Sequence, residues 1–270
     1  MLVVFWSPFH GTGNTANMIA VSGYLAERFK RNVLVTHTHF SMNNLEKPLL
    51  GDIDAGAFFE ETGLEALIRH FKSGNIDEEE VSNCSIDISD KLHLMAGVRM
   101  VSRDSYENEV MKKLIVSVIK KIGGCYDYVM IDANSGYGDL SEELLKMADL
   151  RVITLRQNKG MIELLPETVT SFSDKSIYLL GNYDGYSKLS IRNLRHAYRY
   201  MKRENTFGLR YSTSFADAIS DEKVWKFIKS GIRSEEESPE EGFFDDLKAV
   251  TERMESIHTA SEQLREEKGI

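Results

Sequence analysis

The sequence predicts an α/β fold of three layers, with a mainly parallel sheet of about seven strands covered by helices on both faces. Apolar runs without polar alternation, such as Leu2 to Trp6 and Tyr128 to Ile131, are typical of strands buried on both faces. They alternate along the chain with amphipathic helical segments such as Glu107 to Ile122. This alternation favours a parallel sheet, because each crossover helix packs back onto it. A chain of 270 residues can bury a core of this size.

The first strand leads into a glycine-bearing loop, Ser7 to Gly13, and Asn14 and Thr15 then open a helix. Backbone N–H groups in such a loop, together with the dipole of the following helix, converge on an anion. The sequence therefore predicts a phosphate cradle. Its expected members are Gly11, Thr12, Gly13, Asn14, Thr15 and Ala16.

The usual phosphate-binding loop reads G-x-x-x-x-G-K-S/T. This chain keeps Gly11, Gly13 and the hydroxyl of Thr15, whereas Pro8 replaces the first glycine and Asn14 replaces the lysine. On the motif alone, a plain strand-to-helix turn explains the stretch equally well. Both interpretations stay open at this point.

The second predicted strand, Asn32 to Phe40, carries His37 and His39. Residues two apart on a strand share a face, so a metal-binding pair is one interpretation. Because no third ligand stands nearby in the sequence, half-buried strand histidines are the favoured interpretation. An amphipathic helix at Gly63 to Lys72 and a short strand at Lys91 to Met95 follow.

The strand Tyr128 to Ile131 brings Asp132 to its carboxyl end. Ligands of open α/β sheets bind at that edge. An aspartate that caps a loop is the alternative, but the presence of Thr15 in the first loop favours a functional role.

Two further buried strands are predicted at Asp149 to Gln157 and at Ser176 to Asp184. The second carries Asn182 near its end. A side-chain amide donates and accepts hydrogen bonds at once, which suits a purine edge, although asparagine is also a common turn former.

A predicted helix, Ile191 to Arg203, carries a basic stripe. A solvated helix face is the favoured interpretation, and a surface for nucleic acid or an acidic partner is the alternative. The stripe consists of Arg192, Arg195, Arg199 and Lys202.

The chain has a net charge of −9, and residues 235–270 carry −8 of it. An acidic, proline-bearing linker is predicted at 233–242, after a domain at 1–232. Residues 243–268 then form an expected amphipathic helix with apolar steps of three and four from Phe243 to Leu264. We expect this stripe to pair with another chain, although docking on its own domain gives the same spacing. The acidic tail argues against an anionic membrane surface.

Cysteine usage and hydropathy indicate a cytoplasmic protein. Cys84 and Cys125 lack the paired spacing of zinc sites and disulfide frameworks. No apolar run approaches the ~20 residues that a membrane helix requires. The first strand has no basic region before it, unlike a signal peptide.

Two segments, TGNTANMIAVSGYLA and YDYVMIDANSGYGDL, resemble the ParA/MinD family of dimeric ATPases, and the resemblance covers residues 1–232. It implies a P-loop NTPase-like fold, ATP and Mg²⁺ as cofactors, and a homodimer. It also implies that Thr15 and Asp132 lie at the metal and that Asn182 reads the adenine edge.

The signature lysine of that family falls on Phe9, so both loop lysines are absent. A charge-assisted hydrogen bond contributes ~1.5–3 kcal/mol, and a trans-acting cation on the transferring phosphate is worth ~10³-fold or more in rate. The resemblance therefore implies an ATP-binding dimerisation switch or scaffold with slow or absent hydrolysis. In its lack of lysines, this loop resembles that of the TadZ/CpaE-like proteins, which act in Tad (Flp) pilus assembly and polar localisation.

Two other functions stay open. One is a DNA-partition-type ATPase that uses the basic helix at 191–203. The other is a nucleotide-free pseudo-ATPase that acts only as an interaction module. The missing lysines leave open whether the chain is an active enzyme.

Overall fold

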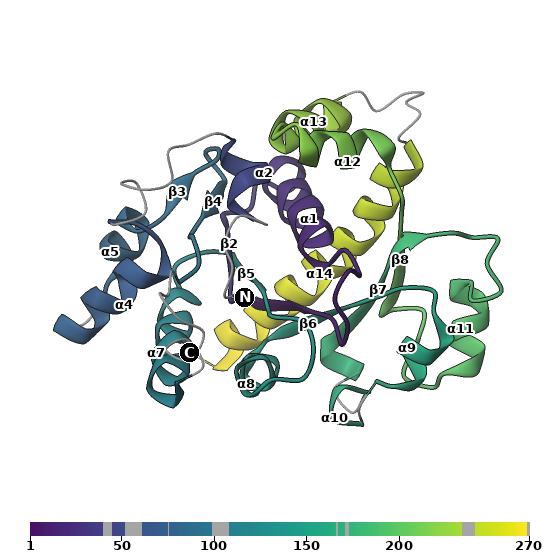
Figure 1. The fold of residues 1–270 in the computed structure, drawn as a ribbon, viewed down its shortest axis with the longest axis horizontal. Helices are drawn as coiled ribbons and strands as arrows, with labels where there is room; N and C mark the ends of the chain where they lie inside the picture. The colour runs from purple at the N-terminus through teal and green to yellow at the C-terminus, as the bar shows by residue number, and fades with distance from the viewer. Residues whose placement is uncertain are drawn as a thin grey trace.

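The computed structural model describes residues 1–39, 45–51, 61–74, 76–98, 108–165, 167–170, 173–233 and 241–268. They form one eight-stranded sheet in the order β3-β4-β2-β5-β1-β6-β7-β8 (Figure 1). All neighbouring strands pair in parallel except β3 and β4. The predicted fold class is confirmed. The strands are β1 (Leu2–Trp6), β2 (Val33–His37), β3 (Ile86–Asp87), β4 (Leu92–Leu94), β5 (Tyr128–Asp132), β6 (Leu150–Leu155), β7 (Ser176–Tyr183) and β8 (Thr206–Arg210).

Each face of the sheet has its own apolar core, because successive side chains of a strand point to opposite faces. Val3 and Phe5 of β1 join one core, whereas Val4 and Trp6 join the other. The first core is covered by α1 (Asn14–Arg28), α2 (Glu46–Leu50), α12 (Thr213–Ser220), α13 (Val224–Arg233) and α14 (Glu241–Lys268). The second is covered by α4 (Gly63–Ser73), α5 (Glu78–Asn83), α7 (Glu109–Ile122), α8 (Asp139–Met147), α9 (Lys159–Glu163), α10 (Glu167–Thr170) and α11 (Ile191–Ala197). A short 3₁₀ turn, η1 (Ser173–Lys175), precedes β7.

Capping residues set the start of α7. The side chain of Asn108 accepts a hydrogen bond from the N–H of Val110 at 2.8 Å, so the helix begins at Glu109. Glu107, where the sequence predicted the start, lies outside the described residues. Among the described helices, none is long and apolar enough to span a membrane.

The predicted basic helix at 191–203 is wrong in its second half, since α11 ends at Ala197. Tyr198 adopts an extended conformation instead. Arg195 is held against the main chain, where its Nη2 donates to the carbonyl of Thr206 at 2.7 Å. Lys202 pairs with Asp174 at 3.3 Å. The four basic residues therefore do not form one helical stripe.

The expectation that the C-terminal stripe pairs with another chain is also wrong for most of its length. α14, yellow in Figure 1, lies against α1 and β8 of the same chain. Four stripe residues are buried there, whereas Leu264 is 55% exposed. Residues 234–240, in the expected linker, lie outside the described part of the chain. The buried stripe residues are Phe243, Leu247, Val250 and Met254.

Candidate functional site

The glycine loop lies at the carboxyl end of β1, where it turns into α1. Gly11 and Gly13 have φ values of 72° and 86°, a left-handed conformation that glycine adopts without strain. Gly13 also occupies the N-cap of α1 and has no side chain to cap the first turn. The N–H groups of that turn are therefore available to a ligand.

Asp132 ends β5, which pairs directly with β1, and its side chain is fully buried. Its Oδ1 accepts a hydrogen bond from the amide of Asn14 at 2.7 Å. Its Oδ2 accepts one from the hydroxyl of Thr15. The structure thus brings together three residues that the sequence singled out from segments more than a hundred positions apart.

His39 is a fourth member of this cluster. It follows β2, the strand on the other side of β5, and its Nε2 lies 3.1 Å from Oδ2 of Asp132. Burial acts to lower the pKa of His39, but the contact with Asp132 and its negative charge outweigh burial and raise that pKa. Sequence reasoning considered His39 only as half of a metal-binding pair with His37 or as a half-buried strand histidine. The signal that could have placed it here is its position just after a strand that borders β5.

His37 points to a different carboxylate. Its Nδ1 accepts from the backbone N–H of His39 at 3.1 Å, so its Nε2 carries the proton and faces Oε1 of Glu46 at 2.6 Å. Within the described ranges, no three potential ligands gather into a metal-binding group. The two histidines therefore serve two separate carboxylates.

Glu46, at the start of α2, is 3% exposed and also accepts from the N–H of Gly97 at 3.2 Å. Burial acts to raise the pKa of Glu46, but the hydrogen bonds from His37 and from the backbone N–H of Gly97 outweigh it and lower the pKa to about 2. This pair fixes α2 against the carboxyl end of β2.

Asn182 follows Gly181, whose backbone lies against the loop. A Cβ added to its neighbour Gly181 would lie 2.9 Å from Nδ2 of Asn17 and 3.0 Å from the carbonyl of Thr12. Asn182 itself is exposed, has a φ of 49°, and sits in a register shift between β7 and β8. Such bulges redirect a side chain.

Arg156 contacts Asn182 and was missed by sequence reasoning. It directly follows β6, so the parallel pairing of β6 and β7 brings it to the same edge of the sheet. With the amide oxygen of Asn182 turned toward it, Nη1 lies at 2.5 Å and Nη2 at 3.1 Å from that oxygen. Nη1 also lies 3.5 Å from the carbonyl of Gly181.

Several buried polar atoms of the loop region have no hydrogen-bond partner. They are Oγ1 of Thr12, Oδ1 of Asn14 and Nδ2 of Asn17. Buried polar atoms are nearly always satisfied, so unpaired ones next to a glycine loop are consistent with a bound polar ligand. Ala16 lies in the first turn of α1, between Thr15 and Asn17.

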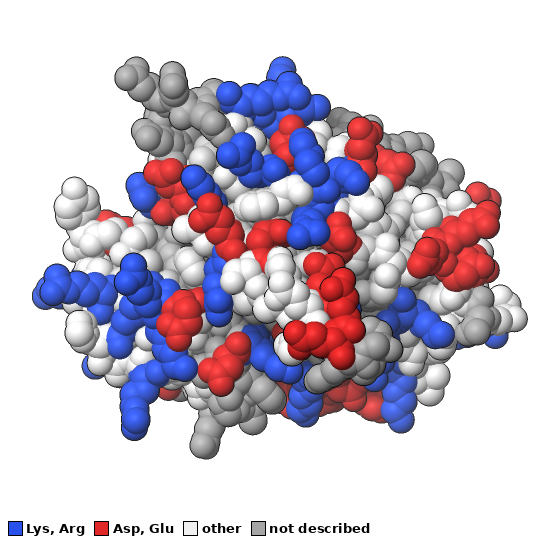
Figure 2. All heavy atoms as spheres, turned by 180° about the vertical axis from the view of Figure 1, so that it is seen from behind, with Lys and Arg blue, Asp and Glu red and all other residues white. Residues whose placement is uncertain are grey.

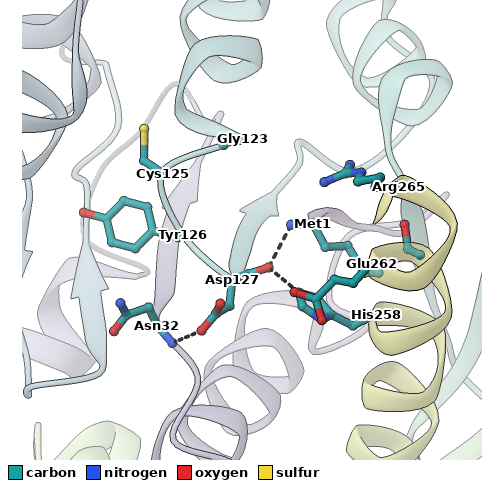
Figure 3. Close-up of a pocket in the computed structure, with 11 residues that line it drawn as sticks. Met1, Asn32, Gly123, Cys125, Tyr126, Asp127, His258, Glu262 and Arg265 are labelled. Atoms are coloured by element: carbon teal, nitrogen blue, oxygen red, sulfur yellow. Dashed lines mark hydrogen bonds and ion pairs between the residues drawn. The ribbon is translucent and has the colours of Figure 1, made fainter. Parts of the chain in front are cut away.

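A separate cavity of about 270 Å³ lies at the opposite edge of the sheet, where the strands begin (Figure 3). It lies between the starts of β1, β2 and β5 and the last turns of α14, and its lining includes Asn32, Asp127 and Arg265. The carbonyl of Asp127 accepts from the terminal ammonium of Met1 at 2.7 Å and contacts Nε2 of His258 at 3.1 Å. These contacts fasten α14 to the sheet.

No protein-family model matches the sequence, and no curated protein matches it. Several solved structures do match the chain. A ParA family ATPase from Chlorobium tepidum TLS superposes with a TM-score of 0.70 and 12% identity, covering 93% of this chain and 98% of that one.

Two further structures with the same fold contain a nucleotide. A putative plasmid partition protein from Borrelia burgdorferi B31, bound to AMPPNP, has a TM-score of 0.67, 13% identity and coverages of 94% and 98%. The septum site-determining protein MinD from Pyrococcus horikoshii OT3, complexed with Mg-ADP, has a TM-score of 0.65, 15% identity and coverages of 94% and 96%. The chain therefore has the fold of ParA- and MinD-type ATPases over almost its whole length.

Proposed function

We propose that this chain is a ParA/MinD-type switch that binds a nucleoside triphosphate with Mg²⁺, dimerises in response, and hydrolyses the nucleotide slowly or not at all. The observation that carries the proposal is the cluster of Asn14, Thr15 and Asp132 beside a left-handed glycine loop. ATP is the nucleotide that the family resemblance implies.

The residues present fit the cofactors. The N–H groups from Gly11 to Ala16 would hold the phosphates, aided by the dipole of α1. Mg²⁺ prefers oxygen ligands, and the hydroxyl of Thr15 and the carboxylate of Asp132 would supply them. His39 contacts the same carboxylate and would have to share it with the metal.

Slow hydrolysis follows from the charges that the loop lacks. Asn14 stands where a phosphate-binding lysine usually lies, and its amide donates to Asp132 instead. Phe9 cannot supply positive charge either. A cation on the transferring phosphate stabilises the charge that develops in the transition state. A loop without such a cation should therefore still bind the nucleotide but hydrolyse it slowly.

Binding is tested by isothermal titration of the full chain with ATP and Mg²⁺. Gly13→Val should abolish saturable binding, because a β-branched residue is strained at a φ of 86°. Gly124→Val, at the opposite edge with open space around its Cβ, is the matched control and should bind normally. No heat from the wild type at millimolar ATP would refute the proposal and favour the nucleotide-free module.

Turnover is expected far below the ordinary enzyme range of ~1–10³ per second. Asn14→Lys should tighten ATP binding by adding a charge-assisted contact, yet leave phosphate release slow while Phe9 is unchanged. A phosphate-release assay on the wild type and this variant checks both statements. A wild-type rate within the ordinary range would contradict the proposed mechanism.

Dimerisation is tested by light scattering with and without ATP and Mg²⁺.

The resemblance of the lysine-poor loop to TadZ/CpaE-like proteins supports a role in Tad pilus assembly or polar localisation. Capture of a protein partner that depends on nucleotide would extend the proposal in that direction.

Two observations weigh against the DNA-partition alternative. Arg195 and Lys202 already bind a carbonyl and a carboxylate of the same chain. On the face shown in Figure 2, basic and acidic side chains lie interspersed. The pseudo-ATPase alternative has one observation in its favour, since Asn14 and His39 both contact the carboxylate that would serve the metal.

A further inference from the structure

The side-chain amide of Asn182 is oriented by the guanidinium of Arg156. An arginine guanidinium carries only donors, so it is the oxygen of Asn182 and not its nitrogen that faces Arg156. The two Nη atoms of Arg156 then approach this oxygen at 2.5 Å and 3.1 Å. Parallel pairing of β6 and β7, with Leu155 opposite Leu180, holds the two residues side by side.

This orientation decides which hydrogen bonds Asn182 can still make. An amide oxygen has two lone pairs, and the two donors of Arg156 occupy both. The Nδ2 group keeps its two N–H donors, and Asn182 is exposed. Asn182 therefore offers donors, and no acceptor, to a ligand at the loop.

The two purines differ in how they match such a group. Adenine presents an amino donor at position 6 beside the N7 acceptor, whereas guanine presents two acceptors, O6 and N7. An asparagine that is free to rotate satisfies adenine with one donor and one acceptor. One that can only donate leaves the adenine amino group without a partner, but it matches O6 and N7 of guanine.

We propose that Arg156 is a specificity-determining residue that locks Asn182 as a donor, so that the site binds GTP at least as tightly as ATP. This inference rests on the proposed nucleotide site and departs from the adenine preference that the resemblance implies for Asn182. The bulge at Gly181 to Tyr183 aims Asn182 out of the sheet, and Gly181 lies directly against Thr12 and Asn17. The backbone that carries Asn182 therefore adjoins the phosphate loop at Gly181.

The experiment measures dissociation constants of GTP and ATP, each with Mg²⁺, on the full-length chain by isothermal titration. The wild type should bind GTP at least as tightly as ATP. Arg156→Met keeps the aliphatic stem but removes the donors, which frees the amide to rotate. The ratio of the two constants should then shift toward ATP by about fivefold or more, the size of a bidentate base contact.

Two further variants serve as controls for the effect of Arg156→Met. Arg199→Met removes an exposed arginine from the segment after α11 and should leave the ratio unchanged. Asn182→Ala should weaken both nucleotides and bring the ratio close to one. Melting curves confirm that each variant is folded.

The outcomes separate the two proposals. A wild type that binds ATP several-fold more tightly than GTP, or a ratio that Arg156→Met does not change, overturns the role of Arg156 and leaves the proposed function standing. If neither nucleotide binds, the proposed function fails, and the base preference fails with it.

Discussion

Deleting residues 241–268 should unfold or aggregate the chain instead of trimming a free appendage. The four buried stripe residues of α14 complete the core that α1 and β8 share. Each buried apolar side chain contributes ~1.5–3 kcal/mol, so the loss is comparable to the ~5–15 kcal/mol by which a typical domain is stable. Circular dichroism melting and gel filtration of the truncated chain test this expectation.

Point variants on one helix make the test sharper. Leu247 is fully buried, and Leu247→Ala should cost ~2–5 kcal/mol of unfolding free energy. Leu264→Ala is the matched control, because Leu264 follows the same apolar pattern but is 55% exposed, and its cost should stay within ~0.5 kcal/mol. Equal effects of the two substitutions in urea unfolding would mean that α14 does not close the core.

Acid should remove a second large contribution to the stability of the fold. This contribution comes from the buried pair formed by Glu46 and His37. The pKa of Glu46 is lowered to about 2, from an ordinary value of 4.5. A carboxyl whose folded pKa is depressed stabilises the fold above its unfolded pKa, and this stability is lost as the pH falls toward the folded pKa. The contribution is about 3 kcal/mol at neutral pH and should disappear between about pH 4.5 and pH 2.

Other carboxyls titrate in the same range, so the experiment compares the wild type with Glu46→Gln. This variant keeps the oxygen that accepts from His37 and loses the charge. Unfolding free energies from urea titrations should differ most near pH 6 and converge as the pH approaches 2. A constant difference across that range would show that the fold does not stabilise the ionised form of Glu46 over the protonated form.

Much of the fold was predictable because its strands are buried on both faces. Runs such as Leu2 to Trp6 have no polar alternation, which identifies a central parallel strand without knowledge of its neighbours. The meeting of Thr15 with Asp132 also follows from topology, since parallel strands present their carboxyl ends at one edge. Neither inference needs a side-chain conformation.

The contacts of His39 and Arg156 could not be predicted in the same way. Both depend on which strands are neighbours, β2 beside β5 and β6 beside β7, and on side-chain torsions that no local pattern encodes. The binding roles proposed for the loop, for Asp132 and for Asn182 are predictions that the experiments above test.

The partner of the C-terminal stripe was mispredicted for a different reason. Steps of three and four residues describe one apolar face of a helix, and they are the same whether that face meets another chain or its own sheet. The acidic stretch before Phe243 suggested a detached helix. The contacts of Glu255 with Arg31 and Tyr128 show how acidic side chains on such a helix can instead attach it to the body.

The docking of α14 on α1 also constrains how the protein is made. Residues at opposite ends of the chain, such as Arg31 and Glu255, contact each other only after all eight strands have been synthesised. During translation the part of this core that α14 covers therefore stays exposed until α14 leaves the ribosome. Exposed apolar surface of this kind recruits chaperones and promotes aggregation. Messages that stop before residue 241 should accordingly yield insoluble polypeptide, and folding should be slow because its closing step joins distant segments.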